Sequence, residues 1–173
     1  EKATLVRQVR PNGVVVLNAD DPRVFAMRHL THAQVHTYGE TDAADIRIMS
    51  REVKTEERAW GREPIGLEIH LQIYNHLKTY VIPGVFGRSI AYAWAAASGV
   101  ADALDVSQEC LDEAAAQFKA LPGRTRIIQG RNGVTIFDDS YNASPAAMMA
   151  GLRDLGEVGL APSQRRIAVF GEM

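Results

Sequence analysis

The sequence has 173 residues, 46% hydrophobic and 23% charged, so it is long and apolar enough to bury a core and is neither disordered nor fibrous. Its formal net charge of −2, from 19 basic and 21 acidic residues, argues against a nucleic-acid partner. The single cysteine, Cys110, excludes an intramolecular disulfide and fits a reducing compartment, and its helical surroundings predict a buried, unreactive side chain. With no apolar run of membrane-spanning length and no signal-peptide layout, we expect a cytoplasmic protein without a membrane partner.

The first forty residues predict alternating helices and strands. Apolar residues at helical spacing predict a helix over residues 2–9, and the apolar run at 14–17 predicts a buried strand. The turn sequence Asn-Ala-Asp-Asp-Pro follows at residues 18–22. A short helix over 23–30 and a second strand over 34–38 complete this part. Alternation of this kind is typical of an α/β fold.

Residues 44–83 change to a period of two, which predicts an antiparallel meander. The expected strands cover residues 46–48, 67–73 and 77–82, and the expected turns cover residues 60–64 and 74–76.

The pattern becomes helical again in the last part of the chain. An alanine-rich helix is expected over residues 91–104, and a second helix from an N-cap at Ser107 to residue 119. Pro-Gly at residues 122–123 breaks the pattern, so we expect a domain boundary there. The elements expected beyond it are strands at 126–129 and 134–137, a helix at 145–155 and a buried strand at 167–170.

The most informative stretch is Asp-Asp-Ser-Tyr-Asn-Ala-Ser-Pro at residues 138–145. It follows the strand at 134–137, which is apolar enough to be buried on both faces, and precedes a helix that Ser144 can cap. Open α/β sheets bind ligands at the carboxyl ends of their strands, so a ligand site is expected here. Each polar residue alone is explained by a cap or a turn. The double acid together with Tyr141 and Asn142 exceeds what one cap requires.

Four segments in this order resemble motifs of the Mur ligases, the ATP-dependent amide-forming enzymes of peptidoglycan precursor synthesis. They are residues 14–22, Leu-Pro-Gly-Arg at 121–124, residues 138–145, and Val-Phe-Gly-Glu-Met at 169–173. The Asp-Asp-Ser-Tyr-Asn-Ala-x-Pro form is similar to that of members that add D-alanyl-D-alanine to a UDP-N-acetylmuramoyl tripeptide through an acyl phosphate. The resemblance implies these two substrates, ATP and Mg2+ as cofactors, and a monomer when the enzyme is intact.

The resemblance also implies that the chain is part of a longer enzyme. Family members carry a substrate-binding domain and then a central domain that opens with the phosphate-binding loop G-x-x-x-x-G-K-[ST], a pattern absent from this sequence. Residues 1–123 are expected to be the later half of a P-loop-type central ATPase domain with the antiparallel meander. Residues 124–173 are expected to begin a partial Rossmann-like carboxyl-terminal domain. Such a fragment is expected to be inactive alone.

The resemblance implies roles for five residues. Lys2 stands where the family has a lysine that takes up carbon dioxide and helps hold magnesium as a carbamate; the alternative is an exposed helix lysine. Arg124 matches an arginine that contacts ATP phosphates or ribose, with an ordinary surface arginine as the alternative. Asp139 matches the acid that binds the nucleotide ribose, and Asp138 beside it is expected to hold the turn. Asn142 matches a position near the transferred phosphate and the acceptor.

One segment departs from the family pattern. The family usually reads Gly-x-His-Asn before the alanine-rich helix, with side chains that approach adenine, whereas this chain reads Gly-Arg-Ser-Ile at residues 87–90. Either adenine is held differently or the nucleotide or substrate preference has changed. Two alternatives therefore stay open: another amide ligase of the superfamily, such as a folylpolyglutamate synthase or a cyanophycin synthetase, and a non-catalytic module that keeps the fold. The five histidines have no metal-ligand spacing and are expected to bind no metal.

Overall fold

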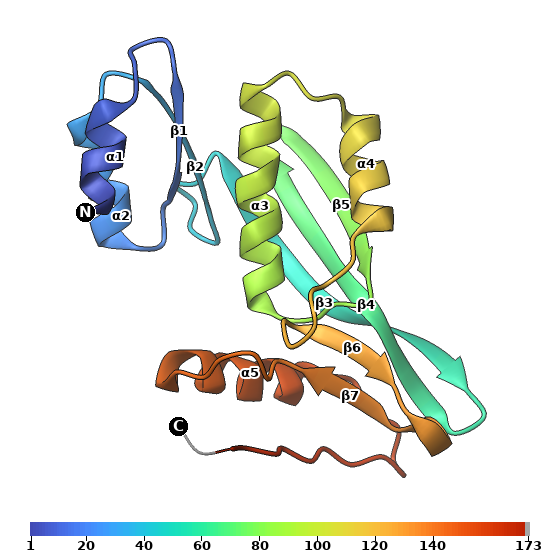
Figure 1. The fold of residues 1–173 in the computed structure, drawn as a ribbon. Coiled ribbons are helices and arrows are strands. Elements are labelled where there is room, and N and C mark those ends of the chain that lie inside the picture. The colour runs from blue at the N-terminus through green and yellow to red at the C-terminus, as the bar shows by residue number, and fades with distance from the viewer. Residues whose placement is uncertain (172–173) are drawn as a thin grey trace. The chain divides into compact units, whose positions relative to one another are not determined.

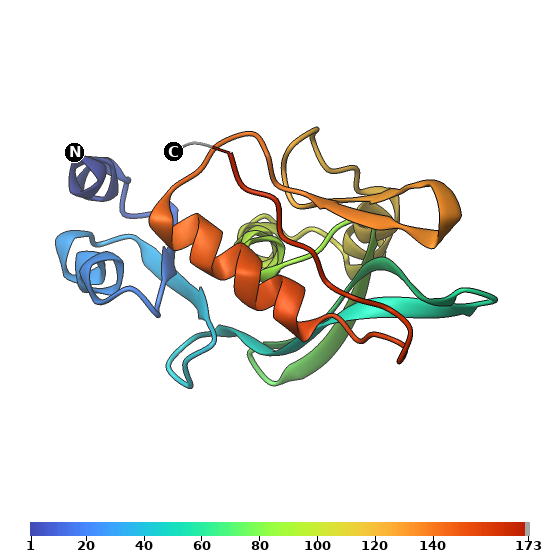
Figure 2. The same cartoon turned by 90° about the horizontal axis from the view of Figure 1, so that it is seen from below.

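A computed structural model describes residues 1–171, which divide into two compact units (Figures 1 and 2). The first unit comprises Glu1–Ser50, Ile69–Thr79 and Ala91–Asp112. The second comprises Arg51–Glu68, Tyr80–Ile90 and the described residues from Glu113 onward. Long strands of the meander contribute residues to both units.

The first unit begins with a small α/β layer. Its elements are α1 (Lys2–Gln8), β1 (Val14–Asn18), α2 (Pro22–Phe25), the 3-10 helix η1 (Ala26–Leu30) and β2 (Gln34–Gly39). Strands β1 and β2 are parallel, in a register that pairs Val14 with Gln34. Both short helices lie on the same side of this pair (Figures 1 and 2), where Val6 packs with Leu17 in the core. The helix expected at 23–30 is thus split into an α turn and a 3-10 segment.

The expected antiparallel meander is present as β3 (Ile46–Arg58), β4 (Gly61–Ile73) and β5 (His76–Pro83). The strand order of the sheet is β1-β2-β3-β4-β5, and β2 pairs in parallel with the start of β3. Two-residue turns join β3 to β4 and β4 to β5, which requires antiparallel neighbours.

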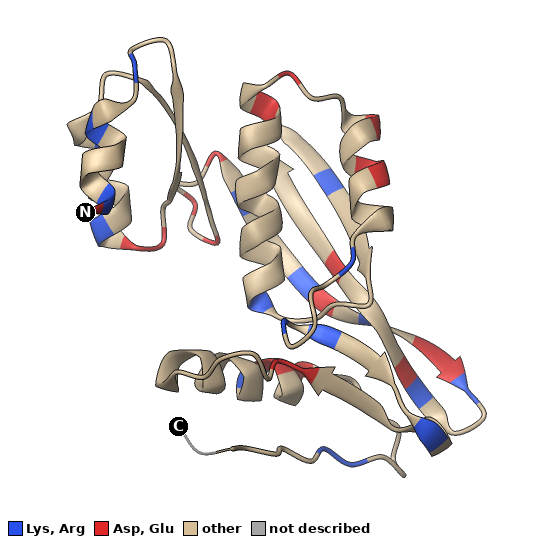
Figure 3. Ribbon diagram, viewed as in Figure 1, with Lys and Arg blue, Asp and Glu red and all other residues tan. Residues whose placement is uncertain are grey.

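Strands β3 and β4 are longer than expected, and the turn expected at residues 60–64 is wrong because β4 already begins at Gly61. Charged residues of both signs lie along this extension (Figure 3), and several of them form ion pairs. Lys54 Nζ lies 2.7 Å from a Glu68 oxygen, and Arg58 Nε lies 3.0 Å from Glu63. Charged arms of this kind carry no period-two apolar signal, so the sequence pattern missed them.

Two helices follow the meander, α3 (Arg88–Ala103) and α4 (Gln108–Gln117). Gly99 of α3 allows close packing in the first unit, because a Cβ there would lie 3.2 Å from side-chain atoms of both Ile46 and Val16. The expected cap of α4 is present, with Ser107 Oγ accepting a hydrogen bond from Cys110 N at 3.4 Å. The prediction that Cys110 is buried is wrong, since its side chain is exposed. Only Ala115 is buried on α4, and Cys110 lies outside that narrow apolar stripe.

The later part of the second unit contains β6 (Arg126–Gln129), the 3-10 turn η2 (Arg131–Gly133), β7 (Thr135–Asp138) and α5 (Pro145–Glu157). Strands β6 and β7 form an antiparallel pair that constitutes a two-stranded sheet among the described residues. The prediction of a strand buried on both faces is therefore wrong: Val134 before β7 is 55% exposed and Ile136 is 47% exposed. Phe137 points the other way, and its ring packs edge-on against Phe86 at 4.8 Å.

The strand expected at residues 167–170 is also wrong. The chain has no regular structure there, and Val169 is 90% exposed (Figure 1). A strand needs a partner for its backbone groups, and no described segment pairs with this one. Arg166 nevertheless attaches the segment to the end of α5, with Nε donating to Leu155 O at 2.9 Å. The last two residues of the expected 169–173 motif, Glu172 and Met173, lie outside the described residues.

The mixed α/β class and its antiparallel meander are confirmed. Within residues 1–171, every helix is too short or too polar to cross a membrane. The domain boundary expected at residues 123–124 stays a prediction.

Candidate functional site

The candidate site joins two segments of the second unit, the crest (residues 138–145, between β7 and α5) and the hinge loop (residues 121–125, before β6). Asp138 Oδ2 accepts a hydrogen bond from Gly123 N at 3.0 Å, and Tyr141 N donates to Gly123 O at 3.0 Å. Gly123 has a φ of +73°, and a Cβ there would lie 2.9 Å from Tyr141 N. The position therefore requires glycine, both for its backbone conformation and for space.

A second hydrogen bond fixes the other side of Arg124. Asp139 Oδ1 accepts from Thr125 N at 3.1 Å, so the residues before and after Arg124 are both bonded to the crest. The guanidinium carbon of Arg124 lies 3.9 Å from the centroid of the Tyr141 ring, a cation–π contact. Both side chains are exposed. A fixed, accessible guanidinium with its planar fork of donors suits a phosphate or a carboxylate ligand.

Asp138 uses both carboxylate oxygens inside this arrangement. Its Oδ1 accepts from Ser140 Oγ at 2.7 Å and from Ser140 N at 3.3 Å, while Oδ2 holds Gly123 N. The Ser140 hydroxyl is the main cause that lowers the pKa of Asp138, with the Gly123 and Ser140 amides and the charge of Arg126 acting in the same direction. Asp138 thus stays ionised and holds the turn.

The end of the crest begins α5. Ser144 Oγ accepts from Ala147 N at 3.2 Å and caps the helix, and Pro145 occupies its first position. Asn142 is exposed, and its Oδ1 accepts from Ala143 N at 2.9 Å.

Four of the five predicted site residues are brought together on the crest and hinge loop: Arg124, Asp138, Asp139 and Asn142. The fifth, Lys2, belongs to the first unit, where it is the exposed first residue of α1. An open surface hollow beside it is lined by Glu1, Thr4 and Leu5.

Asp20 has a structural role in the first unit that the sequence pattern did not reveal. It accepts hydrogen bonds from Glu40 N at 2.7 Å and Thr41 N at 2.9 Å, and also from the Tyr92 hydroxyl. A Cβ on Gly39 would lie 2.6 Å from its Oδ2. The third residue of the Asn-Ala-Asp-Asp turn therefore clamps the loop after β2. An acid two residues after a buried strand was the available signal.

Asp154 on α5 was missed as well. It lies against the segment 87–90, which departs from the family pattern. Its two carboxylate oxygens accept from Arg88 N at 3.3 and 3.2 Å, at the first residue of α3, and Arg51 lies 3.2 Å away. A Cβ on Gly87, whose φ is +91°, would lie 2.8 Å from Asp154 Oδ2. Burial raises the pKa of Asp154, and the charge of Arg51 opposes this. An acid from α5 thus caps α3.

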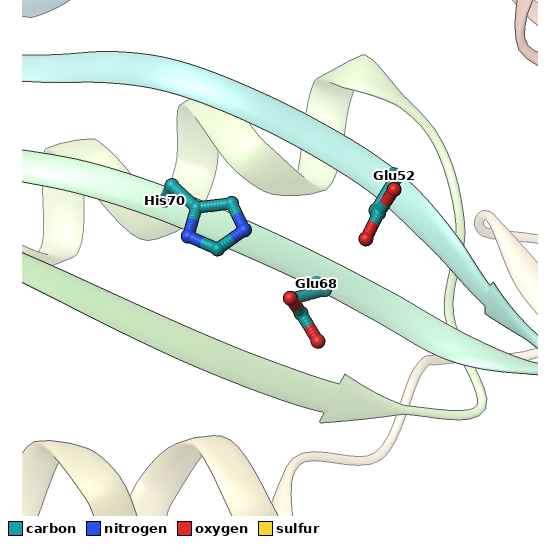
Figure 4. Close-up of side chains that lie close together, drawn as sticks. All are labelled: Glu52, Glu68 and His70. Carbon is teal, nitrogen blue, oxygen red and sulfur yellow. The ribbon is translucent and has the colours of Figure 1, made fainter.

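Three side chains of the meander, Glu52, Glu68 and His70, offer possible metal-ligand atoms within 4.8 Å of one another (Figure 4). Glu68 and His70 lie two residues apart on β4 and so share a face of that strand, and Glu52 is on β3. Glu68 is engaged by Lys54 at 2.7 Å, and His70 Nδ1 lies 2.9 Å from Thr79 Oγ1. These protein partners account for both groups without an ion.

The comparisons with known proteins agree on one family. Residues 123–173 match the family model described as Mur ligase, glutamate ligase domain. The chain is 35% identical to the UDP-N-acetylmuramoyl-tripeptide--D-alanyl-D-alanine ligase of Mycobacterium tuberculosis H37Rv, over 99% of this chain and 32% of that protein. It is 33% identical to the UDP-N-acetylmuramoylalanine--D-glutamate ligase of Nitrosomonas europaea, over 87% of this chain and 30% of that protein.

Solved structures show the same fold. MurF from Acinetobacter baumannii superimposes with a TM-score of 0.73 at 24% identity, over 91% of this chain and 32% of that one. MurF from Thermotoga maritima, solved in complex with ADP, gives a TM-score of 0.69 at 21% identity, over 90% of this chain and 33% of that one.

The fold of the described residues is thus that of the solved MurF structures. The chain belongs to the Mur ligase family. It spans about a third of the length of the curated relatives it matches, 32% in the Mycobacterium tuberculosis case.

Proposed function

We propose that the full-length protein containing this chain is an ATP-dependent amide ligase of peptidoglycan precursor synthesis that adds D-alanyl-D-alanine to a UDP-N-acetylmuramoyl tripeptide. The observation that carries the proposal is the fixed backbone around Arg124. The amides before and after it, at Gly123 and Thr125, donate hydrogen bonds to Asp138 and Asp139, within the segment that matches the family. The 35% identity to a ligase named for these substrates supports the choice of acceptor.

The chemistry asks the protein mainly for charge neutralisation and alignment. The tripeptide carboxylate attacks the γ-phosphate of ATP, ADP leaves, and the amine of the dipeptide displaces phosphate from the resulting acyl phosphate. Because charge builds up on phosphate oxygens, preorganised donors stabilise the transition state more than covalent help would. Arg124 supplies such donors to the phosphates or ribose, Asp139 accepts from the ribose, and Asn142 makes a polar contact near the transferred phosphate.

The residues present fit the expected magnesium site in one respect. Lys2 is exposed on the first turn of α1, so carbon dioxide can reach its amine, and a carbamate there offers the oxygen ligands that Mg2+ prefers. The ion would neutralise phosphate charge when bound. As an unmodified cation, Lys2 would repel it.

We also infer the domain organisation and the cellular location of the full-length protein. Residues 1–123 form the later part of the central ATPase domain, and residues 124–173 begin the carboxyl-terminal domain, so the hinge loop lies at their junction. The enzyme works as a monomer in the cytoplasm, where ATP and nucleotide-linked precursors are available.

Phosphate release by the full-length protein tests the proposal. ATP and the UDP-N-acetylmuramoyl tripeptide are supplied with D-alanyl-D-alanine, and then with D-glutamate or L-alanine and their own nucleotide acceptors. Release that requires D-alanyl-D-alanine supports the proposal. Release with another pair identifies a different Mur ligase, a candidate that the 33% identity to a D-glutamate-adding enzyme favours. No release with any pair indicates a non-catalytic module.

A further inference from the structure

Tyr141 is a crest residue that is 68% exposed, and its ring nevertheless has a defined partner. The ring does not fill a core, and it lies beneath the guanidinium of Arg124 at 3.9 Å. Its backbone N–H donates a hydrogen bond to Gly123 O, which fixes the backbone from which the side chain extends. The ring is therefore held in place to face Arg124 and little else among the described contacts.

Arg124 needs such a partner because the other contacts fix only its backbone environment. Asp138 and Asp139 bond the amides of Gly123 and Thr125, and neither of these hydrogen bonds touches the guanidinium. A free arginine side chain samples many rotamers and loses that freedom when it binds a phosphate. A ring against one face of the guanidinium restricts this freedom and leaves the donors at its edge available.

We propose that Tyr141 is a positioning residue that holds the Arg124 guanidinium ready for a nucleotide phosphate or ribose. The proposal rests on the proposed function, in which Arg124 contacts ATP. It differs from a role in which the Tyr141 ring contacts the nucleotide itself, for instance by stacking on the base. The two roles differ in whether the effect of Tyr141 requires Arg124.

The ring, and not the hydroxyl, makes the contact, which gives a conservative rescue. Tyr141→Phe keeps the ring and should keep the KM for ATP near that of the wild type. Tyr141→Leu removes the ring and should raise the KM for ATP about two- to fivefold, as expected for an exposed cation–π contact, with a smaller change in kcat. Because Tyr141 is exposed, neither substitution should lower the unfolding temperature. Met149→Ala, on α5 and 52% exposed, is the matched control and should leave the KM unchanged.

A double-mutant cycle in the full-length enzyme decides between the roles. The KM for ATP is measured for the wild type, Tyr141→Leu, Arg124→Ala and the double variant. We expect Tyr141→Leu to have no further effect when Arg124 is already alanine. An equal effect in both backgrounds would overturn the proposal in favour of direct contact with the nucleotide. No effect of Tyr141→Leu in the wild-type background would overturn it as well.

The same measurements separate this proposal from the proposed function. A wild-type protein without phosphate release dependent on D-alanyl-D-alanine refutes the function itself. An active wild type in which Arg124→Ala leaves the KM for ATP unchanged removes Arg124 from the nucleotide site, and the role of Tyr141 with it. If the wild type is active, Arg124→Ala raises the KM for ATP and Tyr141→Leu leaves it unchanged, only the role of Tyr141 is refuted.

Discussion

Gly123→Ala should open the contact between the hinge loop and the crest. The φ of +73° places any L-residue in the left-handed region, at a cost of about 1–2 kcal/mol. The new Cβ would also lie 2.9 Å from Tyr141 N and 3.2 Å from Tyr141 Cα, so backbone and not a mobile side chain must move. Loss of one of the two hydrogen bonds of Gly123 to the crest adds about 1 kcal/mol. The expected local destabilisation is about 2–3 kcal/mol.

Hydrogen exchange of the full-length protein measures this effect directly. We expect peptides that cover residues 121–125 to exchange about 30- to 150-fold faster in Gly123→Ala, and the KM for ATP to rise because Arg124 loses its fixed backbone. Gly151→Ala is the control: nothing lies within 4 Å of the added Cβ, and alanine in helix α5 should be neutral or stabilising. Unchanged exchange in Gly123→Ala, or equal effects of both variants, would refute the hydrogen-bonded hinge and crest.

Three further outcomes follow from single side chains. Lys2→Ala should abolish phosphate release. Normal turnover by Lys2→Ala, even with carbon dioxide removed, would exclude the carbamate. Asp139→Ala should weaken ATP binding more than it lowers kcat, because it removes both the proposed ribose contact and the hydrogen bond to Thr125 N. An unchanged affinity for ATP in a calorimetric titration would exclude the ribose role. Asp154 has a raised pKa, so its contribution to stability is fully present below the ordinary carboxyl pKa of about 4 and is lost as pH rises through the raised value. The unfolding temperature of the wild type should therefore exceed that of Asp154→Asn most at acid pH, and a difference that grows with pH would contradict the raised pKa of Asp154.

Local signals in the sequence were enough for much of the fold. The apolar run at residues 14–17 and the alanine-rich α3 are read from neighbouring residues alone, and the structure contains both. The cap at Ser144 followed by Pro145 is also local, and it begins α5 at the expected position. The polar crest could be recognised for the same reason, because its residues are consecutive.

Features that depend on distant partners were not predictable in this way. The residues 167–170 are apolar enough for a strand, but no described segment pairs with them. Asp154 reads as an ordinary helix acid until the fold brings Arg88 and Arg51 to it. Asp138 and Asp139 are adjacent in sequence, yet the amides they hold lie about fifteen residues earlier, as the spacing of 15 residues from Gly123 to Asp138 shows. The two acids therefore define the position of Arg124 through the fold and not through a local motif.

The affinity of the full-length protein for ATP, compared between Arg124→Ala and Arg153→Ala, tests most directly whether the hinge loop and crest form a nucleotide site. Both arginines are exposed in the second unit, but Arg153 lies on α5 outside the crest. Loss of hydrogen bonds from a charged group should weaken ATP binding roughly tenfold or more in Arg124→Ala. Arg153→Ala should bind as the wild type does. Equal affinities of the two variants would contradict the assignment of this site to the nucleotide.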